Sequence, residues 1–174
     1  MIRCFKLGKK ESDIMTKSNT SNIGMRMDSN LKTAADKLHE ELGRKINLVA
    51  LPCLCVDVFD GTDELRAGGE ALNFAAHASK FDEFNVSILG AVGQDSYAKF
   101  IMDSISDKRI DVSHVRIDKD KETANNRTYL TDDGDRYYKD DSWTGDIIDN
   151  MILNHDELEI IKKSDVVFVH FWAG

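Results

Sequence analysis

The sequence predicts an α/β fold with a mostly parallel sheet and a small β appendage. Apolar segments typical of strands alternate with segments of helical periodicity, which indicates right-handed βαβ units. Residues 166–172 form a continuous apolar run, as expected for a strand buried on both faces. Asp132-Asp133-Gly134-Asp135 is a hairpin signal that interrupts the alternation, so we expect a small β lid there.

Composition excludes several classes of protein. The 174 residues are 41% hydrophobic and 31% charged, which is typical of a globular chain. The net charge of −8 arises from 31 acidic and 23 basic residues without a basic block, so we expect no nucleic-acid partner. No apolar run approaches the ~20 residues that span a bilayer. We therefore expect no membrane segment and a cytoplasmic protein, without a signal peptide.

The first 45 residues are predicted to be a polar leader that contains one short amphipathic helix. Residues 1–29 show no sustained period and are expected to be disordered. Residues 31–42 carry an apolar stripe at helical spacing. The globular part is expected to cover residues 46–174, the N-terminal part of a larger domain, with lid segments near 57–67 and 115–138.

The first elements of the globular part follow from apolar runs and caps. Residues 46–58 are of strand type, and Pro52 predicts a break or bulge within them. A helix follows Gly68-Gly69, residues 86–92 form the next strand, and Asp95 can cap a helix over about 96–107.

The later elements are short strands, a helix and a final strand. Short strands are expected at 115–117, 126–130 and 136–138. Asn154 with Glu157 resembles a capping box before a helix that ends near Lys162-Lys163. The last strand would leave an apolar sheet edge, from which we expect a fragment of a longer protein or a partner.

The three cysteines (Cys4, Cys53 and Cys55) do not suggest a disulfide framework. Cys53 and Cys55 are two apart on a predicted strand, so both point to one face. Such a pair can be half of a metal site, but neither a second pair nor a histidine cluster accompanies it. We therefore expect two small buried side chains and no metal site.

Candidate binding residues gather where ligands bind in open α/β sheets, beyond the carboxyl ends of the strands. Asp57 lies near the end of the first strand, Gly68 and Gly69 enter a helix, and Asn73 is one turn into it. A carboxylate, an amide and bare backbone N–H groups suit the hydroxyls of a polyol. Singly, each has a structural explanation as a strand end, a tight turn or a helix-surface group, so the hypothesis depends on their combination.

That combination resembles the ribokinase-like (PfkB-type) carbohydrate kinases. Residues 68–75, GGEALNFA, look like the family's G-G-x-x-x-N-x-A sugar-binding motif. Residues 89–95 are similar to G-x-V-G-x-D, residues 110–115 to G-V-D-x-S-H-V, and residues 123–138 to the lid strands. The resemblance covers about residues 46–174 in register. Within the family, residues 56–59, 134–136 and 169–172 are most like fructoselysine (ketoamine) kinases.

The resemblance implies a ribokinase-like three-layer α/β sandwich with a β lid, truncated after its N-terminal half. The full-length protein would use ATP and Mg²⁺ to phosphorylate a hydroxyl of a sugar or ketoamine. Asp57 would accept hydrogen bonds from sugar hydroxyls, Gly68 and Gly69 would present N–H groups, and Asn73 would bridge another hydroxyl. Arg127 and Arg136 are candidate lid contacts, although a solvated lid arginine is the simpler interpretation. The lid often pairs with that of a second subunit, which implies a homodimer.

Two features depart from the family pattern. Its G-A-G-D motif, which carries the general base and the anion hole, is absent from these 174 residues, so we assign no catalytic residue and expect the chain to be inactive alone. The run before Asp57 is also altered, with Leu54 standing where an asparagine would help to hold the sugar.

Two other functions were weighed against a kinase. A non-catalytic sugar-binding or dimerising remnant of a carbohydrate kinase fits the altered run before Asp57. A nicotinamide-dependent oxidoreductase would need G-x-G-x-x-G directly after the first strand, where this sequence has Asp57-Val58-Phe59-Asp60.

Overall fold

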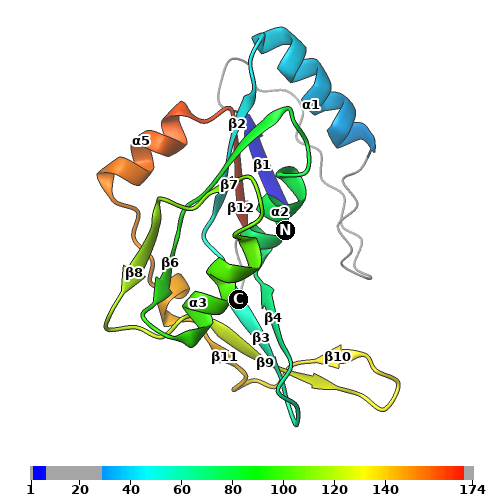
Figure 1. Ribbon diagram of the computed structural model, residues 1–174, viewed down its shortest axis with the longest axis vertical. Coiled ribbons are helices and arrows are strands. Elements are labelled where there is room, and N and C mark those ends of the chain that lie inside the picture. The colour runs from blue at the N-terminus through cyan, green and yellow to red at the C-terminus, as the bar shows by residue number, and fades with distance from the viewer. Residues whose placement is uncertain (1, 7–28, 171–174) are drawn as a thin grey trace.

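A mostly parallel sheet forms the centre of the computed structural model, which describes residues 2–6 and 29–170 (Figure 1). Four of its strands are parallel, and a fifth pairs antiparallel with β12 at one edge. In spatial order the strands are β1 (Ile2–Lys6), β12 (Val166–His170), β2 (Ile46–Leu51), β5 (Phe84–Ile88) and β7 (Ile110–Asp111). The predicted α/β class with a mostly parallel sheet is confirmed.

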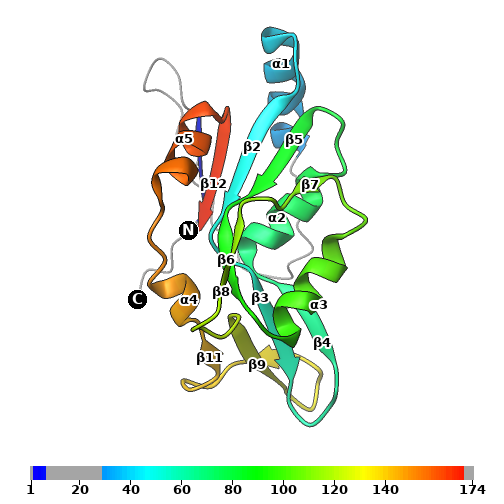
Figure 2. The same ribbon diagram turned by 60° about the vertical axis from the view of Figure 1, so that its left-hand side comes forward.

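Helices cover both faces of this sheet (Figure 2). On one face lies α2 (Glu70–Ala78) and on the other α5 (His155–Lys163), while α1 (Ser29–Leu42) lies beside the start of β2. Nearer the second sheet, α3 (Ser96–Ile105) and α4 (Asp146–Asp149) pack against β6 (Gly90–Gly93). Side chains of β2 alternate between the two faces. Leu48 and Ala50 join the core cluster under α2 and α3, whereas Val49 and Leu51 join the one that packs against α5.

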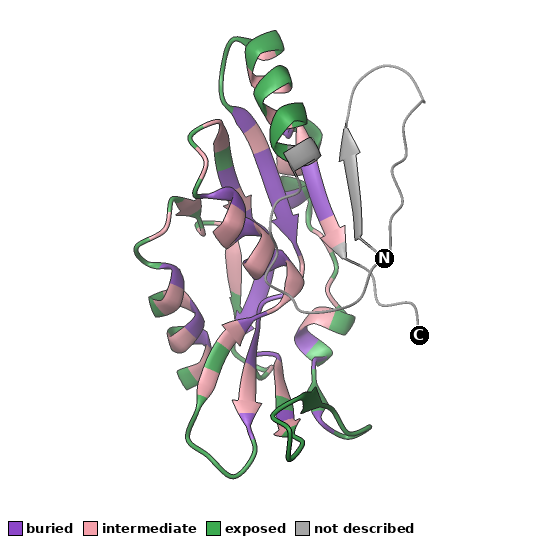
Figure 3. Cartoon of the chain, turned by 90° about the vertical axis from the view of Figure 1, so that its right-hand side faces the viewer, coloured by how far each residue is buried: buried purple, intermediate pink, exposed green. Residues whose placement is uncertain are grey.

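The core lies mainly between the sheet and α2 (Figure 3). Phe168 of β12 is fully buried, and its ring stacks on Phe74 of α2 with centroids 4.0 Å apart. The predicted caps are present, since Asp95 accepts a hydrogen bond from Ala98 N and Asn154 forms a capping box with Glu157. No helix in the described ranges is long and apolar enough to cross a bilayer.

A second sheet, which we call the lid after the predicted segments, lies at the bottom of Figure 1. Its strands are β3 (Cys55–Phe59), β4 (Leu65–Gly68), β9 (Asn125–Leu130), β10 (Arg136–Tyr137) and β11 (Trp143–Thr144). The spatial order is β10-β9-β3-β4, and β11 pairs with β9. The predicted hairpin joins β9 to β10, and Gly134 has the positive φ of 85° that its turn requires.

The second of the two expected lid segments, residues 115–138, differs from the structure at both of its ends. Val115–Asp118, expected in the lid, is β8, which pairs with β6 (Gly90–Gly93) in a separate two-stranded parallel sheet. The lid instead continues past residue 138 to β11. The strand expected over 86–92 is likewise divided into β5 and β6. A Cβ on Gly90 would lie 2.1 Å from Leu54 Cδ1, so only glycine lets β6 pass so close to this core side chain.

The N-terminus departs most from expectation. Ile2–Lys6, within the leader expected to be disordered, is strand β1, and it pairs with β12 along five residues. The edge of β12 that was expected to be open is therefore covered. The N–H and C=O groups of an edge strand can pair with a further strand, and those of β12 pair with β1. Residues 7–28 of the expected leader, and 171–172 of the expected last strand, lie outside the described residues.

Candidate sugar-binding site

Asp57, which was expected near the end of the first strand, lies within the lid, on the strand that follows β2. It is in the middle of β3, directly opposite Arg66 of β4, and its side chain is 19% exposed. A Cβ built on Gly68, at the end of β4, would lie 3.5 Å from Asp57 Oδ2 and 3.9 Å from Cys55 Sγ. Glycine at position 68 therefore leaves the backbone bare beside the carboxylate.

Gly69 continues this bare backbone into α2. Its φ is 99°, which L side chains rarely adopt, and a Cβ there would lie 2.5 Å from the carbonyl oxygen of Cys53. Gly69 is the N-cap of α2, and Leu72 N donates to Cys53 O across 3.3 Å. The Gly-Gly pair thus places the N-terminus of a helix, where backbone N–H groups are available to anions and hydroxyls, next to Asp57.

Asn73 is on the first turn of α2 and is partly buried. Its amide makes no hydrogen bond within the part of the chain that the structure describes. It shares a helix stripe with Glu70, whose charge acts on Asp57. The structure therefore brings Asp57, Gly68 and Gly69 together, and it puts Asn73 on the adjoining helix without a contact to Asp57.

Register assigns the lid side chains to two faces. Residues directly opposite each other on neighbouring strands share a face, and residues two apart on one strand do too. Asp57 is opposite Arg66 and Asn126, Phe59 is opposite Thr128, and Arg136 is opposite Leu130, four residues from Asn126. We call this side of the lid the Asp57 face, and it comprises Asp57, Phe59, Arg66, Asn126, Thr128 and Arg136.

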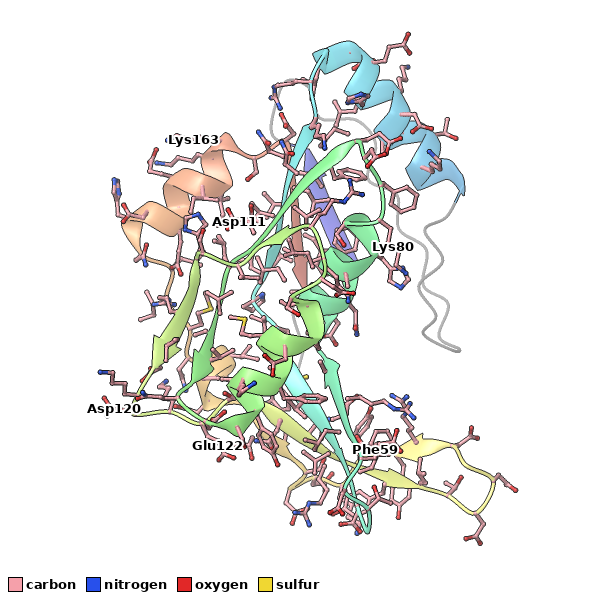
Figure 4. All side chains as sticks on the ribbon, in the orientation of Figure 1. Phe59, Lys80, Asp111, Asp120, Glu122 and Lys163 are labelled. Atoms are coloured by element: carbon pink, nitrogen blue, oxygen red, sulfur yellow. The ribbon has the colours of Figure 1, made fainter. Side chains whose placement is uncertain are left out.

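The two candidate lid arginines lie on opposite faces. Arg136 Nη1 is 3.7 Å from Asp57 Oδ2, and its guanidinium is 5.4 Å from the ring centroid of Phe59, which Figure 4 labels in the lid. Arg127 is opposite Val58, and its Nη1 donates to Asp60 Oδ1 at 3.3 Å. Only Arg136 therefore reaches the predicted site.

Burial dominates the electrostatics of Asp57. Desolvation raises the pKa of this carboxyl above its ordinary value, against the opposing effects of Arg136 and Arg66, and Glu70 raises the pKa further. A carboxylate that is only weakly neutralised by its protein neighbours is a strong acceptor for ligand hydroxyls.

The side chains of residues 53–55, in the altered segment before Asp57, lie partly beside the candidate site and partly in the core. Cys53 and Cys55, both 6% exposed, lie on the side of Asp57, whereas Leu54 is fully buried in the main core cluster. A hydrogen bond with Cys55 and burial raise the pKa of the Cys53 thiol, so it stays neutral and is a poor nucleophile or metal ligand. The two buried thiols match the interpretation made from the sequence. Leu54, in contrast, faces away from the position where a sugar would be held.

Asp95 connects the turn after β6 to the start of the lid. It caps α3 and also accepts hydrogen bonds from Thr123 N and Thr123 Oγ1, at 2.8 and 2.7 Å. Thr123 Oγ1 in turn accepts a hydrogen bond from Gly93 N. Burial would raise the pKa of Asp95, but these hydrogen bonds outweigh it and hold the pKa below its ordinary value. Asp95 therefore holds the turn and the lid together.

Sequence reasoning missed two polar atoms of the Asp57 face. Asn126 Oδ1 and Thr128 Oγ1 are buried and have no hydrogen-bond partner in the described part of the chain. Buried polar atoms are nearly always paired, so unpaired acceptors beside Asp57 indicate a place for a ligand donor. Only the register of β9 against β3 could have identified them, because β-strand alternation alone does not say which strands pair.

Other parts of the structure offer less chemistry. A hollow of about 510 Å³ between β8 and α4 is lined in part by Arg116, Asp118, Lys121 and Ile147, and it does not include the Asp57 face. Within the described residues no cluster of three His, Cys, Asp or Glu side chains is arranged to hold a metal ion.

Known proteins match the part of the chain that contains the candidate site residues. The model of the pfkB family carbohydrate kinases matches residues 57–139, which include Asp57, Gly68, Gly69 and Asn73. Fructoselysine 6-kinases of Escherichia coli (strain K12) and Shigella flexneri are each 25% identical to this chain over 119 residues. The aligned part is 68% of this chain and 44% of each relative, so the chain spans less than half the length of these relatives.

Solved structures of sugar kinases are also similar. A putative sugar kinase from Clostridium perfringens has a TM-score of 0.49 at 16% identity, over 69% of this chain and 40% of that chain. Fructokinase from Vibrio cholerae O395 has a TM-score of 0.48 at 18% identity, over 57% of this chain and 34% of that one. The resemblance found in the sequence is confirmed by the match of residues 57–139 to the model of the pfkB family carbohydrate kinases.

Proposed function

We propose that this chain is the sugar-binding half and lid of an ATP-dependent kinase that phosphorylates a hydroxyl of a sugar or ketoamine. The observation that carries the proposal is the meeting of Asp57, Gly68 and Gly69 at one point within the matched segment. Hydroxyls need both acceptors and donors, and this point offers a carboxylate beside a helix N-terminus. The names of the fructoselysine 6-kinases support a ketoamine as the substrate.

The residues of this chain suggest binding, orientation and exclusion of water rather than chemistry. The Asp57 face would lie over the bound sugar, and closure of such a lid removes water from the reacting groups. The 174 residues contain neither a G-A-G-D motif nor a phosphate loop, so they do not fit ATP and Mg²⁺. The proposal therefore assigns the nucleotide and the metal to the full-length protein, and we derive no chemical step from this chain.

Calorimetric titration of this chain with fructose, ribose and fructoselysine tests the binding proposal. We expect binding of at least one of them, and we expect Asp57→Asn to weaken it by tenfold or more, since a site built for hydroxyls loses affinity when its acceptor becomes an amide (about 1.4 kcal/mol per tenfold). Asp60→Asn is the matched control, because Asp60 pairs with Arg127 on the other face. Equal losses in the two variants, or no sugar binding, would refute the assignment of Asp57.

A second experiment tests the kinase proposal itself. The mass of the native protein, measured by mass spectrometry, is expected to be near twice the 19.6 kDa of this chain. That protein should transfer phosphate from ATP to a ketoamine. A native protein of the mass of this chain that binds sugar without turnover would instead identify a non-catalytic sugar-binding module.

A further inference from the structure

Arg136 differs in its hydrogen bonding from the other arginines whose side chains the structure describes. Each other arginine whose side chain the structure describes donates at least one hydrogen bond, and these are Arg44, Arg66, Arg109, Arg116 and Arg127. Arg136 donates none within the described residues, although its guanidinium has five N–H donors. Its side chain is 43% exposed, so these donors are accessible to a ligand.

The position of Arg136 is nevertheless defined. Its guanidinium lies 5.4 Å from the ring centroid of Phe59, where stacking on the aromatic face is favourable. Arg66 lies 4.8 Å from the same centroid but is already bonded to Glu64, with Nε donating to Oε1 at 2.7 Å. Phe59 therefore holds two cations beside Asp57, and of the two only Arg136 donates no hydrogen bond within the described residues.

Asp57 does not use these donors either. The closest approach of the two side chains is 3.7 Å, which is an ion pair without a hydrogen bond. Both groups lie on the Asp57 face, so a ligand whose hydroxyls reach Asp57 comes within a few ångströms of Arg136. A guanidinium binds carboxylate and phosphate oxygens through two parallel hydrogen bonds.

From this arrangement we propose that Arg136 determines substrate specificity by binding an oxyanion carried close to the hydroxyls that Asp57 holds. The proposal rests on the sugar-kinase function proposed above and narrows its substrate class to sugars with an acidic group, either a carboxylate or a phosphate. Because Arg136 and Asp57 are neighbours, the acidic group is attached to the sugar directly or through a short linker.

Calorimetry on this chain tests the proposal with a matched pair of ligands. Fructosylglycine carries a carboxylate two bonds beyond its amine, and fructosylethylamine has a methyl group there. At low salt, of about 50 mM, where charge pairs are least screened, we expect fructosylglycine to bind about tenfold more tightly. A fructose monophosphate compared with fructose distinguishes phosphate from carboxylate, since only the preferred anion should show the gain.

Variants identify the residue responsible. Arg136→Gln should abolish the preference for the anionic ligand, and Arg136→Lys should keep part of the preference as a point charge. Arg127→Gln, on the opposite face, should keep all of it. Fructose binding without any preference for either anion, or a preference that survives Arg136→Gln, overturns the role of Arg136 alone. Absence of all sugar binding overturns the proposed function as well.

Discussion

The central sheet and the lid sheet are stabilised by different kinds of contact. Strands β2 and β12 bury apolar side chains on both faces, and the charged Asp165 lies directly before β12. The lid is mostly half-exposed, and guanidinium groups, aromatic rings and carboxylates face one another across its strands. The difference shows that the central sheet provides stability, whereas the lid can carry polar groups that a ligand could use.

Substitution of Leu54 is expected to have the largest effect on stability, because this core residue lies between the last strand of the central sheet before it, β2, and the first strand of the lid, β3. Leu54→Asn buries an amide without partners and removes packing against Gly90, so we expect a loss of about 3–4 kcal/mol of unfolding free energy. Urea unfolding measures the loss. Ile117→Asn on β8, where the side chain is 65% exposed, is the control and should change stability by less than about 0.5 kcal/mol. Improved sugar binding by Leu54→Asn would show that this side chain faces the site.

Gly69 joins strand β4 of the lid to the helix α2. Its substitution should lower the unfolding free energy by less than Leu54→Asn does. Gly69→Ala combines an unfavourable positive φ with a Cβ 2.5 Å from Cys53 O, so we expect a loss of about 2–3 kcal/mol. Gly134→Ala in the lid hairpin has a similar φ of 85° and open space, and it should cost about 1 kcal/mol. The difference between the variants measures the contact with Cys53. Equal losses in thermal or urea unfolding would contradict the close approach.

Asp95 connects the turn after β6 to the lid through its hydrogen bonds with Thr123. Its substitution should lower the unfolding free energy by less than that of Gly69. Asp95→Ala removes the cap of α3 and the partner of Thr123, so we expect a loss of about 1–2 kcal/mol. Because the pKa of Asp95 is lowered in the folded protein, its contribution is present above the ordinary aspartate pKa of about 3.9 and is lost as pH falls through the lower folded value. Asp103→Ala, on the exposed side of α3, is the control. Parallel acid-unfolding curves for wild type and Asp95→Ala would contradict this linkage.

The central sheet could be predicted from the sequence more completely than the lid. The helices and strands of the central sheet could be predicted because burial requires apolar runs of the right period, as in β12 and α2. The Gly-Gly pair could be predicted because it directly precedes a segment of helical period, whereas Asp57, expected near the end of the first strand, lies in the middle of β3. The break within 86–92 could not be predicted, because β6 pairs with β8 outside the central sheet, and the residue pattern of β6 does not show which strand is its partner.

The lid could be predicted only in part for a related reason. Its hairpin has a local signal at residues 132–135, but β3 and β9 are parallel neighbours that are far apart in sequence. Register between such strands is set by tertiary contacts, and a shift of one residue would exchange the faces of Arg127 and Arg136. The same reasoning applies to β1, whose partner strand is at the other end of the chain.

The pH dependence of sugar binding is the smallest effect and the one that most directly tests the Asp57 face. Burial raises the pKa of Asp57 in the folded protein, so its carboxylate begins to take up a proton at a higher pH than an ordinary aspartate, for which the pKa is about 3.9. A protonated carboxyl is a poorer acceptor for hydroxyls. Fructose affinity is therefore expected to fall on acidification while the protein is still folded, and calorimetry at several pH values with circular dichroism alongside measures this.

The same pKa shift has the opposite sign for stability. A carboxyl whose pKa is raised on folding destabilises the folded protein once pH exceeds its unfolded value, so Asp57→Asn should not lower the unfolding free energy at neutral pH. The variant should instead bind fructose weakly and independently of pH, since an amide does not titrate. A wild-type affinity that stays constant down to acid unfolding would mean that Asp57 does not touch the sugar. A fall that persists in Asp57→Asn would assign the titration to a group other than Asp57.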